Sequence, residues 1–111
     1  MVRLDNRQTR ESITDKINRY QIGLAVILKR RDPSERKELL LDYRRRTYSY
    51  MSSFLRGSMA VPLEIYHADQ RAKKELEAYG IYDTVSVVLP PKQQKEYETR
   101  YQSKLELVAS D

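Results

Sequence analysis

The sequence predicts a mainly α-helical protein of four helices, with an antiparallel helical hairpin in the N-terminal half and one short extended segment between helices three and four. Three observations lead to this fold class. Apolar residues recur at alternating steps of three and four over most of the chain, which is the period of an α-helix. Residues that commonly start or end helices separate these stretches. One stretch, 83–89, is instead rich in β-branched residues and alternates in polarity.

The first helix is expected over residues 9–31. Its apolar residues alternate between steps of four and three, so they share one side of a helix. These residues are Ile13, Ile17, Tyr20, Leu24 and Ile27. The run IGLAVIL at 22–28 is also short enough to be a buried strand, which is the competing interpretation. Because the stripe begins well before that run and keeps its phase through it, the helix is favoured.

The second helix is expected to run to Arg56 and to start at the sequence DPSE. Asp32 suits the N-cap, Pro33 the first helical turn, and Glu35 the position that completes a capping box. Gly57 is expected to end the helix in the left-handed conformation. Because the connection around Asp32 is short, helices one and two should lie antiparallel.

The third helix is expected to begin at Pro62 and to stop at Gly80. There Ile81 would fold back over the last helical turn, as in many glycine-ended helices. The apolar residues of this helix again recur at steps of three and four, which predicts one buried side. This stripe is Ile65, Ala68, Ala72, Leu76 and Tyr79.

Residues 83–89 are expected to be extended. Because a lone strand is not stable, this segment is expected to pair with residues 2–4 or with the same segment of a second subunit. Pro90 and Pro91 end it and begin the fourth helix. The expected buried stripe of that helix is Tyr97, Tyr101, Leu105 and Val108.

Composition limits the classes of function. At 111 residues the chain is expected to form a single helical domain, residues 1–111. It has no cysteine for a disulfide or a cysteine zinc site, and its one histidine, His67, cannot form a metal-binding histidine pair. Its three glycines are spread singly, so there is no glycine-rich phosphate loop. We expect no catalytic residues, metal or cofactor; an enzyme whose site forms only in an oligomer is the least favoured alternative.

Neither a secretory signal nor a membrane span is expected. The N-terminal sequence MVRLDNRQTRES is polar where a signal peptide needs an apolar run. The longest apolar run, at 24–28, is far shorter than the roughly 20 residues that span a bilayer. The sequence therefore predicts a soluble, cytoplasmic protein, and the lack of cysteine fits a reducing compartment.

Positive charge is concentrated in the N-terminal half. The net charge is +5, but residues 1–57 carry 14 Lys and Arg against 7 Asp and Glu, whereas residues 58–111 carry 7 against 9. This asymmetry predicts one positive face or end. Such a face could meet nucleic acid, an acidic protein, or the acidic half of another copy of the chain.

Three consecutive arginines, 44–46, lie in the middle of the second helix. Successive helical positions differ by about 100°, so the three cannot face the same way. Together with the basic residues near the hairpin turn they form the candidate nucleic-acid-binding set, which would contact phosphates. This set is Lys29, Arg30, Arg31, Arg36, Lys37, Arg44, Arg45 and Arg46. The alternative is a solvated face neutralised by Glu35, Glu38 and Asp42.

Tyrosine dominates the aromatic residues, with nine tyrosines against one phenylalanine and no tryptophan. Each tyrosine combines an apolar ring with a polar tip, which suits partly wet interfaces. The candidates for partner or subunit contacts are Tyr48, Tyr50, Tyr97 and Tyr101. The alternative is a thin core whose aromatic rings reach solvent at their edges.

These observations favour a non-enzymatic binding protein. The first hypothesis is a small basic helical regulator or accessory factor that associates with nucleic acid, in which the hairpin supplies the cations and the C-terminal half supplies assembly as a homodimer. The second is an adaptor or assembly factor whose basic half docks on an acidic protein partner and whose tyrosines make the contact.

Overall fold

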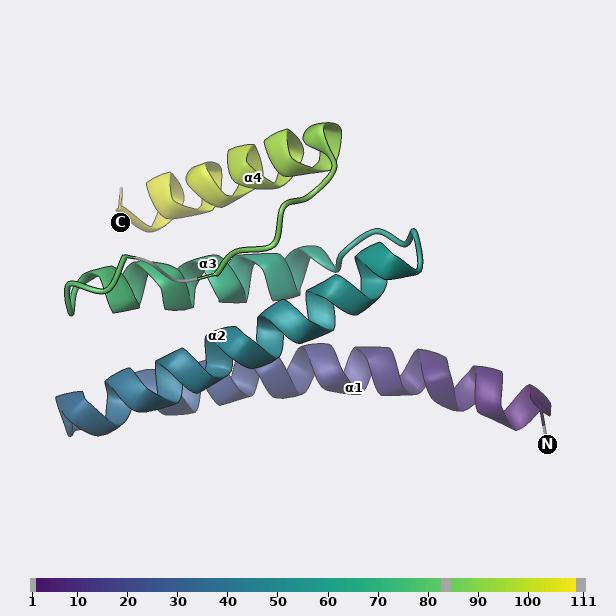
Figure 1. Cartoon of the computed structure of the whole chain (residues 1–111), viewed down its shortest axis with the longest axis horizontal. Coiled ribbons are helices and arrows are strands. Elements are labelled where there is room, and N and C mark those ends of the chain that lie inside the picture. The colour runs from purple at the N-terminus through teal and green to yellow at the C-terminus, as the bar shows by residue number, and fades with distance from the viewer. Residues whose placement is uncertain (1, 83–84, 110–111) are drawn as a thin grey trace.

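Four helices form the regular structure of the computed structural model (Figure 1). They are α1 (Val2–Leu28), α2 (Pro33–Arg56), α3 (Leu63–Glu77) and α4 (Pro91–Ala109). The structure describes the backbone at 2–82 and 85–109 and the side chains at 13–82 and 85–102. α1 and α2 run in opposite directions, and both pack against α3. The predicted fold class, with its N-terminal hairpin, is confirmed.

The helix α1 is longer at its start than predicted and shorter at its end. It begins at Val2 rather than at residue 9, since a formed helix gains one hydrogen bond for each residue that it adds. It ends at Leu28, where Lys29 N donates to Val26 O at 3.2 Å in a tighter final turn. The run at 22–28 is thus helical, and the strand alternative is wrong.

The connector between α3 and α4 is described at 78–82 and 85–90, and its second part runs back along α3 to the start of α4 (Figure 1). Its described residues form no strand. The expected pairing with residues 2–4 is wrong, because those residues belong to α1. The connector is instead held by side chains: Leu89 is buried in the core, and the carbonyl of Val85 accepts a hydrogen bond from Arg44.

The start of α2 follows the sequence closely. Asp32 caps it, because its carboxylate Oδ1 accepts a hydrogen bond from Ser34 N at 3.0 Å, and Pro33 is the first helical residue. Glu35, predicted to complete a capping box, instead pairs with Arg30, with Oε1 3.4 Å from Nη1. This contact joins the first turn of α2 to the end of α1.

The end of α2 differs from the prediction by one residue. Gly57 has φ −88°, and its N–H still donates to Ser53 O, so helical bonding continues through it. Ser58 takes the left-handed conformation, with φ 55°. Met59 N then donates to Phe54 O at 2.8 Å, which closes the turn that normally ends with glycine.

The end of α3 is as predicted. Gly80 has φ 78°, and Ile81 N donates to Leu76 O at 3.1 Å. The side chain of Ile81 folds back and packs on the core. The start of α3 lies one residue later than predicted, at Leu63, with Pro62 in the N-cap position.

Two groups of buried apolar side chains form the core. The first lies among α1, α2 and α3 and comprises Leu24, Ile27, Leu40, Tyr43, Ala68, Ala72 and Leu76. The second joins α2 and α3 to the connector and comprises Met51, Phe54, Val61, Ile65, Tyr66 and Leu89. Four of the five stripe residues predicted for α3 are buried in these groups, and the fifth, Tyr79, packs against the first. Helical periodicity thus identified the buried side of α3 correctly.

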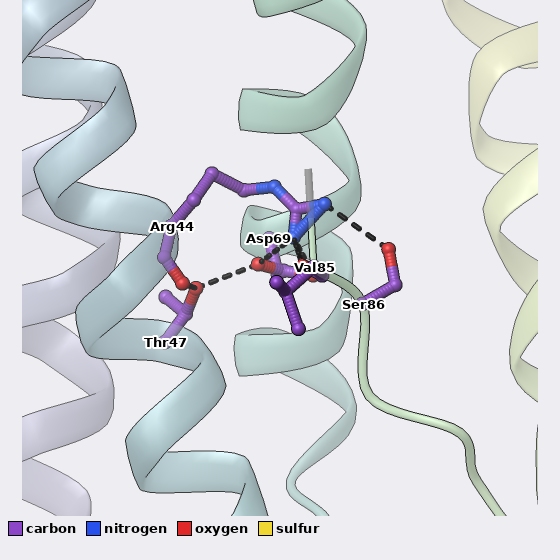
Figure 2. Close-up of polar contacts among 5 residues, drawn as sticks. All are labelled: Arg44, Thr47, Asp69, Val85 and Ser86. Carbon is purple, nitrogen blue, oxygen red and sulfur yellow. Dashed lines mark hydrogen bonds and ion pairs between the residues drawn. The ribbon is translucent and has the colours of Figure 1, made fainter. Parts of the chain in front are cut away.

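A buried ion pair joins α2, α3 and the connector (Figure 2). The guanidinium Nη1 of Arg44 lies 3.0 and 3.2 Å from the two carboxylate oxygens of Asp69, and these side chains are only 3% and 1% exposed. Arg44 also donates to Val85 O at 2.9 Å and to Ser86 Oγ at 3.2 Å. Thr47 donates to Asp69 Oδ1 at 2.6 Å.

Burial has the largest effect on the pKa of the Asp69 carboxyl. It raises the pKa of that group above its ordinary value, and the charge of Arg44 and the hydroxyl of Thr47 oppose the rise. The Arg44 guanidinium is a buried cation, so it needs a carboxylate opposite it. Each member of the pair therefore makes the burial of the other tolerable.

We expect that Ser58→Gly will stabilise the protein by about 1 kcal/mol, because glycine adopts the left-handed conformation without strain. The matched control is Gly80→Ser, which places serine where φ is 78° and should destabilise by a similar amount. A Cβ at Gly80 meets nothing within 4 Å, so that loss would be conformational rather than steric. Urea unfolding measures both; changes of the same sign would contradict the assignment of the two helix ends.

We also expect Arg44→Gln to lower the free energy of unfolding by about 3 kcal/mol or more, because it leaves a buried carboxylate without its partner. Arg45→Gln is the matched control, since Arg45 is exposed on the same helix. It should change stability by less than about 0.5 kcal/mol. Equal effects of the two substitutions in urea unfolding would show that the ion pair does not stabilise the fold.

Candidate functional site

A groove of about 500 Å³ runs along one side of the α1–α2 hairpin. It is lined by both helices, and the α1 residues follow helical spacing beside the buried stripe. Its lining residues are Lys16, Arg19, Tyr20, Gly23, Val26, Ile27 and Arg30 from α1, and Leu39, Tyr43, Arg46 and Tyr50 from α2. Its volume is within the range of sites that bind small molecules or short segments of a polymer.

Four cations line this groove: Lys16, Arg19, Arg30 and Arg46. Among the side chains that the structure describes, no aspartate or glutamate lines it. Two of the cations have carboxylate neighbours outside the lining: Arg46 lies 2.7 Å from Asp42, and Arg30 pairs with Glu35. The side chains of Arg46 and Arg30 remain 62% and 50% exposed, so these surface pairs leave both cations accessible to an anion.

Tyrosine rings form much of the groove wall. Tyr20 and Tyr50 stack with ring centroids 5.4 Å apart and planes 21° apart, and Tyr43 meets Tyr20 edge-on at 5.7 Å. Hydrogen bonds fix two of these rings: Tyr43 donates to Tyr20 O at 2.7 Å, and Tyr20 donates to Arg46 O at 3.2 Å. Lys16 Nζ lies 5.3 Å from the Tyr50 ring centre, a cation–π contact.

The tyrosine hydroxyls add no negative charge to the groove. Burial raises the pKa of Tyr20, Tyr43 and Tyr50 above the ordinary tyrosine value. These groups therefore stay neutral at physiological pH, and the charge of the groove comes from its Lys and Arg side chains. The arrangement suits an anion that also carries a flat or apolar body.

The three-arginine run divides in three directions. Arg44 points inward to Asp69, and Arg46 lines the groove. Arg45 is exposed and lies about 200° around the helix from Tyr43, which faces the groove, so it points away. The three arginines diverge, as helical geometry predicts. Arg44, a member of the predicted nucleic-acid-binding set, is buried and therefore not accessible to a phosphate in the folded protein.

The other predicted cations surround the hairpin turn. Lys29 and Arg31 are exposed, and Lys37 is partly exposed. Arg36 donates to the hydroxyl of Tyr79 and to the carbonyl of Arg30, so it links α2 to the ends of α1 and α3. Of the eight predicted nucleic-acid contacts, the structure brings Arg30 and Arg46 together in the groove.

Two groove cations, Lys16 and Arg19, were missed by the sequence analysis. A signal for them exists in the sequence: residues 16, 19, 23, 26 and 30 alternate between steps of three and four. They therefore form a second stripe beside the apolar one, with basic residues at both ends and a glycine in the middle.

The four tyrosines predicted as partner contacts occupy different environments. Tyr48 is exposed, and Tyr50 lines the groove. Tyr97 donates to Val61 O at 2.8 Å, and Tyr101 is buried on the same side of α4. Much of the surface of Tyr97 and Tyr101 is thus used within the chain, which supports the alternative of a core with aromatic edges; the subunit contact stays a prediction.

Another hollow, of about 520 Å³, lies between α3 and α4. It is lined by charges of both signs, including Lys74, Lys95 and Glu98. The glutamate carboxylate accepts a hydrogen bond from Gln94 Nε2. A hollow of mixed charge is less suited to a polyanion than the groove of the hairpin.

In the described part of the chain, His, Asp and Glu side chains form no group of three that could hold a metal ion. None of the helices there has both the length and the apolar character required for a bilayer span.

The tyrosine pKa shifts predict alkaline instability. Because folding raises these pKa values, the folded protein holds its tyrosine protons more tightly than the unfolded chain, so the free energy of unfolding should fall as the pH rises above about 10. In Tyr43→Phe this fall should be shallower, by up to about 1.4 kcal/mol per pH unit. Urea unfolding between pH 8 and 11 measures both slopes; identical slopes would contradict the raised pKa of Tyr43.

No protein-family model matches the chain, and neither the curated proteins nor the solved structures give a significant match.

Proposed function

We propose that this chain is a non-enzymatic nucleic-acid-binding protein, a small regulator or accessory factor, and that the groove of the α1–α2 hairpin contacts the sugar–phosphate backbone. The observation that carries the proposal is the convergence of Lys16, Arg19, Arg30 and Arg46 on one groove, with no carboxylate among its described lining residues. Such a set can replace the counterions of several phosphates at once.

The dimensions of the groove suit a polymer rather than a single phosphate. Lys16 and Arg30 are 14 positions apart on α1, which corresponds to about 21 Å along the helix axis. Arg46 enters from α2, so positive charge lies on both walls. A nucleic-acid backbone lying along the hairpin would meet several of these cations in succession.

The test compares two triple variants that remove the same charge. Arg19→Gln, Arg30→Gln and Arg46→Gln remove groove cations, whereas Lys29→Gln, Arg31→Gln and Arg45→Gln remove cations outside the groove lining. The groove variant should bind a labelled oligonucleotide about 100-fold more weakly, and its slope of log K against log salt should fall by about 2. The control variant should bind within about threefold of the unaltered protein.

Fluorescence polarization at several salt concentrations gives both quantities. Absence of binding by the unaltered protein at low salt would refute the proposal. An equal loss in the two variants would show that overall charge, and not the groove, attracts the nucleic acid. Arg44 is kept in both variants because its loss would act on stability instead.

A second candidate function is an adaptor that docks on an acidic protein partner. It is favoured by two apolar side chains exposed on α1, Ile22 at 63% and Val26 at 50%, because Val26 also lines the groove. An acidic amphipathic helix could cover these side chains and meet the cations together. The two functions separate in the same titration, since an adaptor would bind an acidic helical peptide and no oligonucleotide.

A further inference from the structure

Between its cations the groove is lined by apolar and aromatic side chains, which a surface that contacts only phosphates would not need. These side chains, here called the floor of the groove, are Tyr20, Val26, Ile27 and Tyr50. Tyr20 and Tyr50 are partly exposed, so their stacked pair is reached from the groove. A ligand that contacted the cations alone would leave this apolar floor in water.

Gly23 makes room for a ligand at the middle of the groove. It lies seven residues from both Lys16 and Arg30, about 10 Å from each along the axis. A Cβ built on it would come no closer than 4.0 Å to the ring of Tyr43, which is an ordinary contact. Alanine therefore fits at position 23, whereas a longer side chain would extend into the groove.

From these features we infer that the groove takes an unpaired stretch of nucleic acid, with its bases against the apolar floor and its phosphates on the four cations. The inference rests on the proposed function and specifies its substrate. In a duplex the base faces are already stacked and covered, so a duplex can offer its backbone and base edges to this groove but no base faces. A single strand offers base faces that can stack on tyrosine rings, as in other proteins that bind single strands.

The cations and the floor thus have separate tasks. Lys16, Arg19, Arg30 and Arg46 attract any polyanion, whether or not its bases are accessible. The floor around Gly23 and Tyr50 binds a strand with accessible bases more tightly than a strand without them. Substitutions in the floor should therefore change the preference among nucleic acids, whereas substitutions of the cations weaken all of them.

The experiment measures binding of three labelled probes at low salt: a 12-nucleotide oligothymidine, an abasic strand with the same number of phosphates, and a 12-base-pair duplex. The unaltered protein should bind oligothymidine at least 10-fold more tightly than the other two. Gly23→Leu should lower oligothymidine affinity about 10-fold and leave abasic and duplex binding within twofold. Ala25→Leu, the matched control, adds a leucine on an exposed position of α1 outside the groove lining and should bind all three probes as the unaltered protein does.

A second pair of variants tests the floor without adding volume. Tyr50→Leu removes the aromatic ring and should weaken oligothymidine binding, whereas Tyr50→Phe keeps the ring and should not. The hydroxyl of Tyr50 is buried and makes no hydrogen bond within the described residues, so the phenylalanine variant should fold normally. Circular dichroism checks the helix content of all variants. If Gly23→Leu does not fold, the Tyr50 pair decides the question.

The possible failures are distinguishable. Equal binding of all three probes, unchanged by Gly23→Leu and Tyr50→Leu, would overturn the single-strand inference and leave nucleic-acid binding in place. Binding of none of the probes would overturn the proposed function and the inference together. Binding of an acidic helical peptide in place of every probe would overturn both and assign the groove to a protein partner.

Discussion

The buried pair of Arg44 and Asp69 is the polar contact that joins the α1–α2 hairpin to α3 and the connector. Two charges removed from water are tolerated only if they meet each other, so α2 must turn Arg44 toward α3. Together with the buried apolar residues Leu40, Tyr43, Met51 and Phe54, that requirement fixes the rotation of α2 about its own axis. Since neighbouring helical positions differ by about 100°, Arg46 is then placed in the groove and Arg45 on the far side. The buried side of α2, which includes this ion pair, thus determines which cations are available for binding.

Part of the space between α1 and α2 is left unfilled, and this space forms the groove. Gly23 contributes no side chain, and Tyr43 opposite it is held in place by its hydrogen bond to Tyr20 O. Glycine in the middle of a helix costs about 1 kcal/mol relative to alanine. Nothing in the contacts around Gly23 requires that cost, because a Cβ would fit. The glycine at position 23 is therefore not required by a close approach of the two helices; its effect is to leave space in the groove.

Much of this fold could be predicted from the sequence, because helical period and helix ends are local properties. The cap at Asp32 and the stop at Gly80 depend on a few neighbouring residues. The fate of the arginines is not local. Helical geometry shows that the three must diverge, but the inward one is chosen by Asp69, which lies 25 residues further along the chain. Lys16 and Arg19 lie on a helical stripe that the sequence shows. That this stripe lines a groove becomes evident only once α2 is placed beside α1.

The connector has a consequence for how the C-terminal helix is retained. Arg44 donates a hydrogen bond to the connector at Val85 O, and Leu89 N of the connector donates to Gln94 of α4. Tyr97 of α4 donates to Val61 O. The connector therefore links α4 to the buried α2–α3 contact, through Arg44 at one end and Gln94 at the other. Loss of the Arg44 contact should consequently loosen the docking of α4 as well as the contact between α2 and α3.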